Sequence, residues 1–325
     1  MAGQFDDWEV SPEAQPRPED YAYDLDRALA SVVGLSAKVP PDAFTAATLG
    51  VDRAGNGVVI RSDGLVLTIG YLVTEAEEIT LATADGRTVQ GHVLGYDQAS
   101  GFGLVQALDP LGLPALALGA ATRAPVGQPV VIGGAGGRAR SVAARILAKQ
   151  EFSGYWEYLL DEAIFTGPPH PFWGGAAMIG PAGDLLGVGS LQVQQRGPGG
   201  RPLALNMVVP IDLLPPVFDD LLAGKPSVPA RPWLGVYAQE QDERIVLIGF
   251  AGEGPARRAG LKEGDVVLAV GGEPVATLAD FYRALWGLGS AGVAAPLTLD
   301  REGDVFDVEV TTSDRRRYLK TARYN

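Results

Sequence analysis

The sequence contains no cysteine, which excludes disulfides, thiolate nucleophiles and cysteine-based zinc or iron–sulfur sites. Histidine is almost as scarce, since His92 and His170 are the only two among 325 residues. No apolar run approaches the roughly 18 residues that a membrane-spanning helix needs. The segment from Met1 to Tyr23 is acidic and rich in proline, without the apolar core of a signal peptide. From the chain as given we predict no membrane span and a cytoplasmic location.

Basic residues are also in deficit. The sequence has 39 acidic and 26 basic residues, for a formal net charge of −13. Because such a surface repels a phosphate backbone, we predict no nucleic-acid partner. The one dense basic run occupies the last eleven residues and comprises Arg315, Arg316, Arg317, Lys320 and Arg323. We interpret it as a solvated tail, with an electrostatic dock for an acidic partner as the alternative.

Glycine and proline are abundant and separate short runs rich in Val, Leu, Ile and Thr, a pattern typical of a turn-dense, mainly β protein. One series of short strands runs from Ala47 to Leu118, with turns at Asp63-Gly64 and Asp85-Gly86. A second series runs from Pro129 to Val209. Two successive meanders of similar length predict two closed barrels packed as one domain.

The clearest boundary is a stretch with three prolines in seven residues, Pro226 to Pro232, which continues neither a helix nor a central strand. We predict five segments: a flexible arm at 1–22, a double-barrel domain at 23–222, a linker at 223–231, a smaller β-rich domain at 232–313 and the basic tail at 314–325.

Three stretches have helical patterns. Ile211–Leu222 and Leu278–Trp286 each carry apolar residues on one face, and Thr277 with Asp280 forms a capping-box pattern at the start of the second. Asp24–Leu35 suits either a helix or the opening of the first strand.

Four segments, in this order and spacing, resemble the HtrA/Deg family of trypsin-like serine proteases. The segments are Gly55–Thr68, Gly95–Val105, Asp161–Gly175 and Asn206–Asp212. The resemblance implies a chymotrypsin-like double β-barrel followed by a second domain. It also implies homotrimers built through the N-terminal part of the barrel domain.

The family's catalytic His, Asp and Ser fall on Tyr71, Gly101 and Trp173. A serine attacks an amide only when a neighbouring imidazole takes its proton and a carboxylate orients that imidazole. A phenol with a pKa near ~10, a glycine and an indole do not supply these groups. No serine lies between Gly154 and Gly189, so a shift of register does not restore one. We therefore predict an inactive protease homologue with no catalytic residue.

The smaller domain resembles a PDZ domain of the HtrA type, because Trp233–Val236 lies where the family has its carboxylate-binding loop and Gly254–Val275 is close to its signature segment. A PDZ domain adds an extended C-terminus to its sheet as a strand and holds the terminal carboxylate with loop N–H groups. The residues that we predict to bind peptide are Trp233, Leu234, Gly235, Val236, Phe281 and Leu285. They favour a small or medium apolar terminal residue, and a packing or regulatory role for the domain is the alternative.

Together these observations predict a non-proteolytic pseudoprotease that acts as an adaptor, scaffold or assembly factor. Its partner would be a protein, held by a C-terminal peptide in the PDZ groove, by the degenerate cleft or by both, with no cofactor and no metal. One alternative is a hydrolase or metal-dependent enzyme with a reshaped site that uses groups such as His92 and His170. Another is a purely structural subunit of a larger complex. Trp173 either fills the old cleft as a lid or packs as an ordinary loop residue.

Overall fold

The computed structural model describes residues 8–196, 198–225 and 229–320, which form two compact units. The first comprises the described residues of Met1–Gln150 and Glu162–Lys225, and the second those of Glu151–Asp161 and Pro226–Thr321. The predicted division kept 23–222 together, whereas Glu151–Asp161 packs within the second unit. Among the described residues, no helix has the length and apolar character to cross a membrane.

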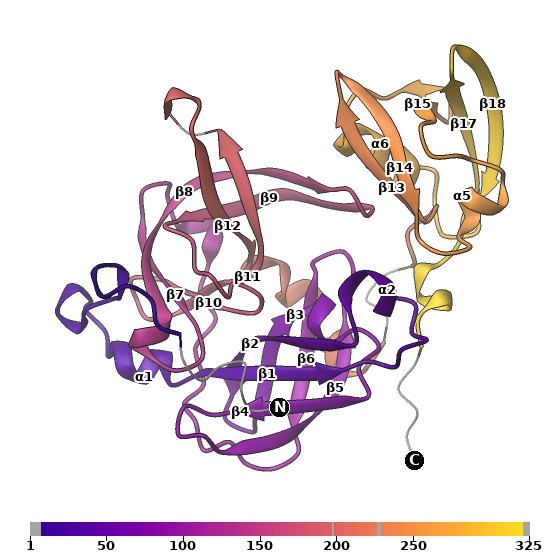
Figure 1. The fold of residues 1–325 in the computed structure, drawn as a ribbon. Coiled ribbons are helices and arrows are strands. Elements are labelled where there is room, and N and C mark those ends of the chain that lie inside the picture. The colour runs from indigo at the N-terminus through magenta and orange to yellow at the C-terminus, as the bar shows by residue number, and fades with distance from the viewer. Residues whose placement is uncertain (1–7, 197, 226–228, 321–325) are drawn as a thin grey trace. The chain divides into compact units, whose positions relative to one another are not determined.

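The first unit opens with a closed barrel of six antiparallel strands in the order β1-β2-β3-β6-β5-β4 (Figure 1). The strands are β1 (Val32–Lys38), β2 (Asp52–Arg61), β3 (Leu65–Ile69), β4 (Glu78–Ala82), β5 (Thr88–Tyr96) and β6 (Phe102–Ala107). Gly64 and Gly86 occupy the two predicted Asp-Gly turns with φ of 86° and 84°, a conformation that glycine adopts without steric cost. Val33, Leu67 and Leu104 are fully buried, so the interior is a packed core.

A second closed barrel follows, in the order β10-β11-β12-β9-β8-β7. Its strands are β7 (Pro129–Gly133), β8 (Ser141–Gly154), β9 (Tyr158–Gly167), β10 (Ala177–Ile179), β11 (Leu185–Arg196) and β12 (Pro202–Pro210). The loop between β9 and β10 holds the position predicted for the protease nucleophile, and the link between β8 and β9 belongs to the second unit. The prediction of two barrels is confirmed.

The second unit is a sheet in the order β13-β14-β15-β17-β18, with β16 paired to β15 (Figure 1). Its strands are β13 (Val236–Gln241), β14 (Arg244–Phe250), β15 (Val266–Val270), β16 (Glu273–Pro274), β17 (Ala294–Arg301) and β18 (Asp304–Thr311). Helix α6 (Leu278–Gly287) begins at the predicted capping box, in which Thr277 accepts from the Asp280 amide and Asp280 from the Thr277 amide. Its Phe281 and Leu285 are fully buried in the core of this unit.

The other helices are short. They are α1 (Leu25–Leu29), α2 (Ala46–Leu49), α3 (Gly70–Val73), α4 (Phe218–Leu222), α5 (Pro255–Arg258) and the 3-10 turns η1 (Pro12–Ala14), η2 (Pro18–Asp20), η3 (Ala121–Arg123), η4 (Arg138–Arg140), η5 (Pro198–Gly200), η6 (Ile211–Leu213), η7 (Pro215–Val217) and η8 (Arg315–Tyr318). The single helix predicted over Ile211–Leu222 is wrong, because Pro215 and Pro216 lack the amide hydrogens that a continuous helix uses. Asp24–Leu35 contains both alternatives, a capped turn in α1 followed by β1.

The segment predicted as a flexible arm is mostly exposed where the structure describes it, but Val10 is fixed to the rest of the first unit. The amide of Val10 donates to the carbonyl of Ala139 at 2.8 Å, and the Val10 side chain is buried. Residues 1–7 of the predicted arm, 226–228 of the predicted linker and 321–325 of the predicted tail lie outside the described residues. Within the tail, the ring of Tyr318 packs on that of Trp233, with 4.8 Å between the ring centroids.

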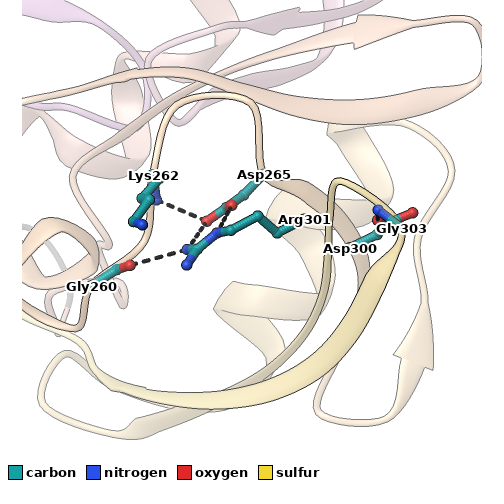
Figure 2. Close-up of polar contacts among 6 residues, drawn as sticks. All are labelled: Gly260, Lys262, Asp265, Asp300, Arg301 and Gly303. Carbon is teal, nitrogen blue, oxygen red and sulfur yellow. Dashed lines mark hydrogen bonds and ion pairs between the residues drawn. The ribbon is translucent and has the colours of Figure 1, made fainter.

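An ion pair between the buried Asp265 and the partly exposed Arg301 lies in the second unit (Figure 2). The Arg301 guanidinium donates to both carboxylate oxygens of Asp265, at 2.6 and 2.8 Å, and to the Gly260 carbonyl at 3.1 Å. The amide of Lys262 donates to the same carboxylate at 2.8 Å. Burial by itself raises the pKa of Asp265, but the bonds from Arg301 and Lys262 outweigh it and leave the pKa below its ordinary value. The stability that this carboxylate contributes is therefore present above about pH 3.9 and is lost as the pH falls through the lower folded pKa.

Asp265→Ala should destabilise the second unit by about 2 kcal/mol, because Arg301 and the Lys262 amide lose a charged acceptor that is nearly inaccessible to solvent. Hydrogen exchange of the β15 and β17 amides in the full chain measures the loss. Glu253→Ala is the matched control, since its ion pair with Arg257 is exposed. Equal protection in the two variants would contradict the assignment.

Candidate functional site

Tyr71, which the resemblance predicts at the position of the family's histidine, lies in α3 directly after β3. The Gly70 amide donates to the Gly101 carbonyl at 2.6 Å, so the turn before β6 holds the start of this helix. The Tyr71 hydroxyl donates to the carbonyl of Ser190 at 2.8 Å. Burial raises the pKa of Tyr71 above its ordinary value, and a side-chain hydrogen bond with Trp173 opposes the rise. Tyr71 is therefore a neutral donor that joins the two barrels.

Arg53 of β2 binds backbone carbonyls in α3 and directly after it. Its guanidinium donates to the carbonyls of Tyr71 and Thr74 at 2.7 and 2.9 Å, and to the Thr45 hydroxyl at 2.8 Å. The Glu75 carboxylate in turn accepts from the Thr45 amide at 2.7 Å. Burial lowers the pKa of Arg53 to about 10, while Glu75 acts in the opposite direction, so the guanidinium remains a cation at neutral pH. A charged network thus fixes the backbone that carries Tyr71.

Trp173 and the two glycines after it are held by Asn56 of β2. The Asn56 side chain donates to the carbonyls of Phe172 and Gly174, at 2.9 and 3.1 Å, and accepts from the Ala135 amide at 2.9 Å. Gly175 has a φ of 76°, and a Cβ atom there would lie 1.8 Å from the Asn56 carbonyl oxygen. The loop is therefore shaped by backbone contacts that only glycine permits at this position.

His170 lies three residues before Trp173 and is fully buried. Its Nε2 donates to the Arg140 carbonyl at 2.8 Å while its Nδ1 accepts from the Phe172 amide at 3.0 Å. Burial lowers the pKa of His170, against the effect of these two backbone bonds. The ring of Trp8 packs edge-on against His170, with 5.5 Å between the centroids. Both ring nitrogens are engaged, so this histidine supports the loop rather than presenting a free base.

The structure brings Tyr71 and Trp173 together and places Gly101 next to the start of α3. The two histidines belong to different barrels: His92 lies on β5 of the first barrel, and His170 lies in the loop between β9 and β10 of the second barrel. Among the described residues, no group of three or more His, Asp and Glu side chains is placed to hold a metal ion.

The predicted PDZ loop of the second unit surrounds a carboxylate of the same chain. Amides of Leu234, Gly235 and Val236 donate to Glu157 at 3.1, 2.7 and 3.0 Å. Burial raises the pKa of Glu157 to about 7, although these three amides and the charge of Arg315 lower it. The loop is thus a carboxyl-binding site that already holds a carboxyl group.

The structure places the predicted residues of α6 in the core of the second unit. Phe281 and Leu285 are fully buried in the core, and the helix presents Tyr282 instead, whose hydroxyl accepts from the Glu157 amide at 3.3 Å. Sequence reasoning missed Glu157 and Tyr282. The one local sign is an aromatic pair, Tyr155-Trp156, directly before Glu157, in a stretch between two predicted strands to which no structure was assigned.

Several curated proteins resemble this chain. A probable periplasmic serine endoprotease, DegP-like, of Pseudomonas fluorescens is 29% identical over 270 residues, which cover 79% of this chain and 55% of the relative. A protein of the same name from Halomonas elongata is 29% identical over 277 residues, covering 80% and 56%. The chain therefore spans about half the length of the curated relatives that it matches.

Two solved structures share the fold. One, described as the HtrA-type protease AlgW with decapeptide, gives a TM-score of 0.54 at 20% identity and covers 90% of this chain and 97% of its own. The serine endoprotease from Yersinia pestis gives a TM-score of 0.52 at 21% identity, with coverage of 89% and 95%.

These comparisons correct two predictions. The inactive, non-proteolytic protein predicted from Tyr71, Gly101 and Trp173 is contradicted by the relatives, which are named serine endoproteases. That prediction inferred the activity of the whole chain from three side chains. The cytoplasmic location is contradicted by the same names, which are those of periplasmic proteins. It was drawn from the absence of an apolar leader in the sequence as given.

Gly175→Ala should cost about 4 kcal/mol or more, because the new methyl group overlaps the Asn56 carbonyl and the loop must move. Gly86→Ala is the matched control: it has a similar positive φ of 84°, but nothing lies within 4 Å of the added carbon, so about 1 kcal/mol is expected. Urea unfolding of the first unit in the full chain measures both. A cost for Gly175→Ala no larger than that of the control would show that the loop does not depend on this contact.

Two family models match the chain in succession. A trypsin-like peptidase domain matches residues 55–188, and a PDZ domain matches residues 232–312. The two matches cover the double barrel and the sheet unit in the order that the resemblance predicted. With the relatives and the solved folds they show that the chain belongs to the HtrA family, whose members join a trypsin-like domain to a PDZ domain.

Proposed function

We propose that this chain binds polypeptides by their C-terminal segments, through the PDZ loop and strand β13. The observation that carries the proposal is the convergence of three consecutive amides, those of Leu234, Gly235 and Val236, on one carboxylate within 3.1 Å. Gly235 has a φ of 76°, a left-handed conformation that glycine adopts without steric cost and that lets the loop curve around the carboxylate. Such a set of N–H groups selects a carboxylate by geometry and partial charge.

Strand β13 supplies the second element of a peptide site. It stands at the end of the sheet order, with β14 as its one neighbour in that order, so its outer side is the edge to which a further strand can be added. An extended peptide added there would gain main-chain hydrogen bonds along β13 while its terminal carboxylate meets the loop. For the terminal side chain, a small or medium apolar residue remains our prediction from the apolar residues of the loop and of α6, which are buried in the core of this unit.

Peptide-bond hydrolysis of the bound polypeptide is the second candidate, and the names of the relatives favour it. These names also favour a periplasmic location, and the HtrA family favours a homo-oligomer, for which a homotrimer is our proposal. Two residues near the candidate nucleophile position, Tyr71 and His170, limit how hydrolysis could proceed. Tyr71 holds its proton, and both nitrogens of His170 are bonded, so water or a nucleophile would be activated by groups other than these two.

Peptide binding is tested with an array of decapeptides that end in valine, each made with a free carboxylate and as the C-terminal amide. We expect the full chain to retain a subset of the free acids and to lose them as amides, because an amide supplies one acceptor where the loop amides share two carboxylate oxygens. Equal retention of acids and amides would refute recognition by the carboxylate loop.

Hydrolysis is tested with denatured casein as substrate and mass spectrometry of the products. The parent chain is compared with Tyr71→Phe and Trp173→Ala, purified by the same route, because both side chains line the loop at the candidate cleft. Cleavage in this cleft predicts fragments in proportion to the parent concentration and at least a tenfold change of rate in the variants. No fragments, or equal rates in all three preparations, would exclude cleavage there.

A further inference from the structure

The peptide site proposed above is occupied by the chain itself. The carbonyl of Tyr155 accepts from the amide of Ala238 on β13 at 2.9 Å, and the carboxylate of Glu157, two residues later, accepts from the loop amides. A main-chain bond to the edge strand and a carboxylate in the loop are the two contacts that strand addition of a C-terminal peptide makes. Both come from one short segment, residues 154–157.

We propose that residues 154–157 are an internal ligand of the PDZ groove, which a polypeptide C-terminus must displace in order to bind. The inference rests on the proposed peptide-binding function and adds its regulation. The Glu157 side chain takes the place of a terminal carboxylate, and its backbone φ of 58° turns the chain away from the loop, so that the strand continues into β9 without a free end.

Helix α6 holds the same segment from the other side. The Tyr282 hydroxyl donates to the Gly154 carbonyl at 2.7 Å and accepts from the Glu157 amide. Arg283 forms exposed ion pairs with Glu151, which lies before the segment, and with Asp161, which lies after it. Leu159 belongs to the hydrophobic core of the second unit. The segment is therefore seated between β13 and α6, where a bound peptide strand would lie.

Two carboxylates do not fit this loop together. The three amides are the donors to Glu157, and the other charged or titratable groups that act on it are Arg315 of η8 and Tyr282 of α6, with Glu240 acting in turn on Tyr282. A second carboxylate would bring like charge into a buried site with one nearby cation. Binding of an external C-terminus and docking of Glu157 are thus mutually exclusive.

Because the internal ligand is covalently attached, its effective concentration at the loop is in the millimolar range or above. An external peptide binds only while the loop is vacant, so its apparent affinity is its intrinsic affinity multiplied by the vacant fraction. Glu157→Ala removes the carboxylate and leaves the loop amides available. We therefore expect the variant to bind the valine-terminated decapeptides of the array at least ten times more tightly than the parent.

The test measures the anisotropy of fluorescein-labelled decapeptides from this array with the full-length parent, Glu157→Ala and Glu157→Gln, the last keeping the shape of the side chain while removing its charge. Arg283→Ala loosens both ends of the segment without touching the loop, so it should also raise the affinity, by a smaller factor. Glu253→Ala removes an exposed carboxylate of the same unit and should change nothing.

Hydrogen exchange supplies a reading that needs no peptide. The amides of Leu234, Gly235 and Val236 should be protected in the parent and in Glu253→Ala, and should exchange faster in Glu157→Ala. Equal affinity of the parent and of all three loosened variants for the decapeptides would overturn the internal ligand while leaving the peptide-binding function intact. Failure of every free-acid decapeptide to bind even Glu157→Ala, with exchange showing the PDZ sheet folded, would overturn both.

Discussion

Three buried backbone amides in the second unit need an acceptor. An N–H group that is buried without a partner costs about 1–3 kcal/mol, so a loop that directs three of them to one point is stable only when something fills that point. In this chain Glu157 fills it, 77 to 79 residues before its partners in the sequence. The same requirement explains why segment Glu151–Asp161 packs with the sheet unit, and why the unit boundaries depart from the order of the sequence.

The cleft of the first unit is built on backbone positions more than on the side chains that catalysis would use. Asn56 fixes the loop after Phe172, Arg53 fixes the helix of Tyr71, and Gly175 occupies space that no side chain fits. These contacts hold the two barrels together around Tyr71 and Trp173, two of the positions that the resemblance predicted for the catalytic triad. The absence of proteolytic activity that we inferred from those three positions was contradicted by the relatives, which is a reason to identify the reacting groups by experiment.

Much of the fold was predictable because its signals are local. Asp-Gly turns at Gly64 and Gly86, and the capping box at Thr277, act within a few residues, and the structure has each of them. Local pattern misled where two prolines interrupt the apolar face of Ile211–Leu222. The contact of Glu157 had no local signal at all, because a carboxylate in a hairpin has the same sequence context whether it is solvated or bound by a distant loop. The packing of Trp8 on His170 was unpredictable for the same reason.

Strand β9 links Glu157, at its beginning, to the loop that carries Trp173, at its end. Its pairing with β12 joins Thr166 to Asn206, Phe165 to Met207 and Ile164 to Val208. Phe165 is buried in the barrel, and a slip of one residue would turn it outward, so this end of the strand keeps its register whatever happens at the other. Release of Glu157 would therefore loosen the first residues of β9 without shifting the register of the strand.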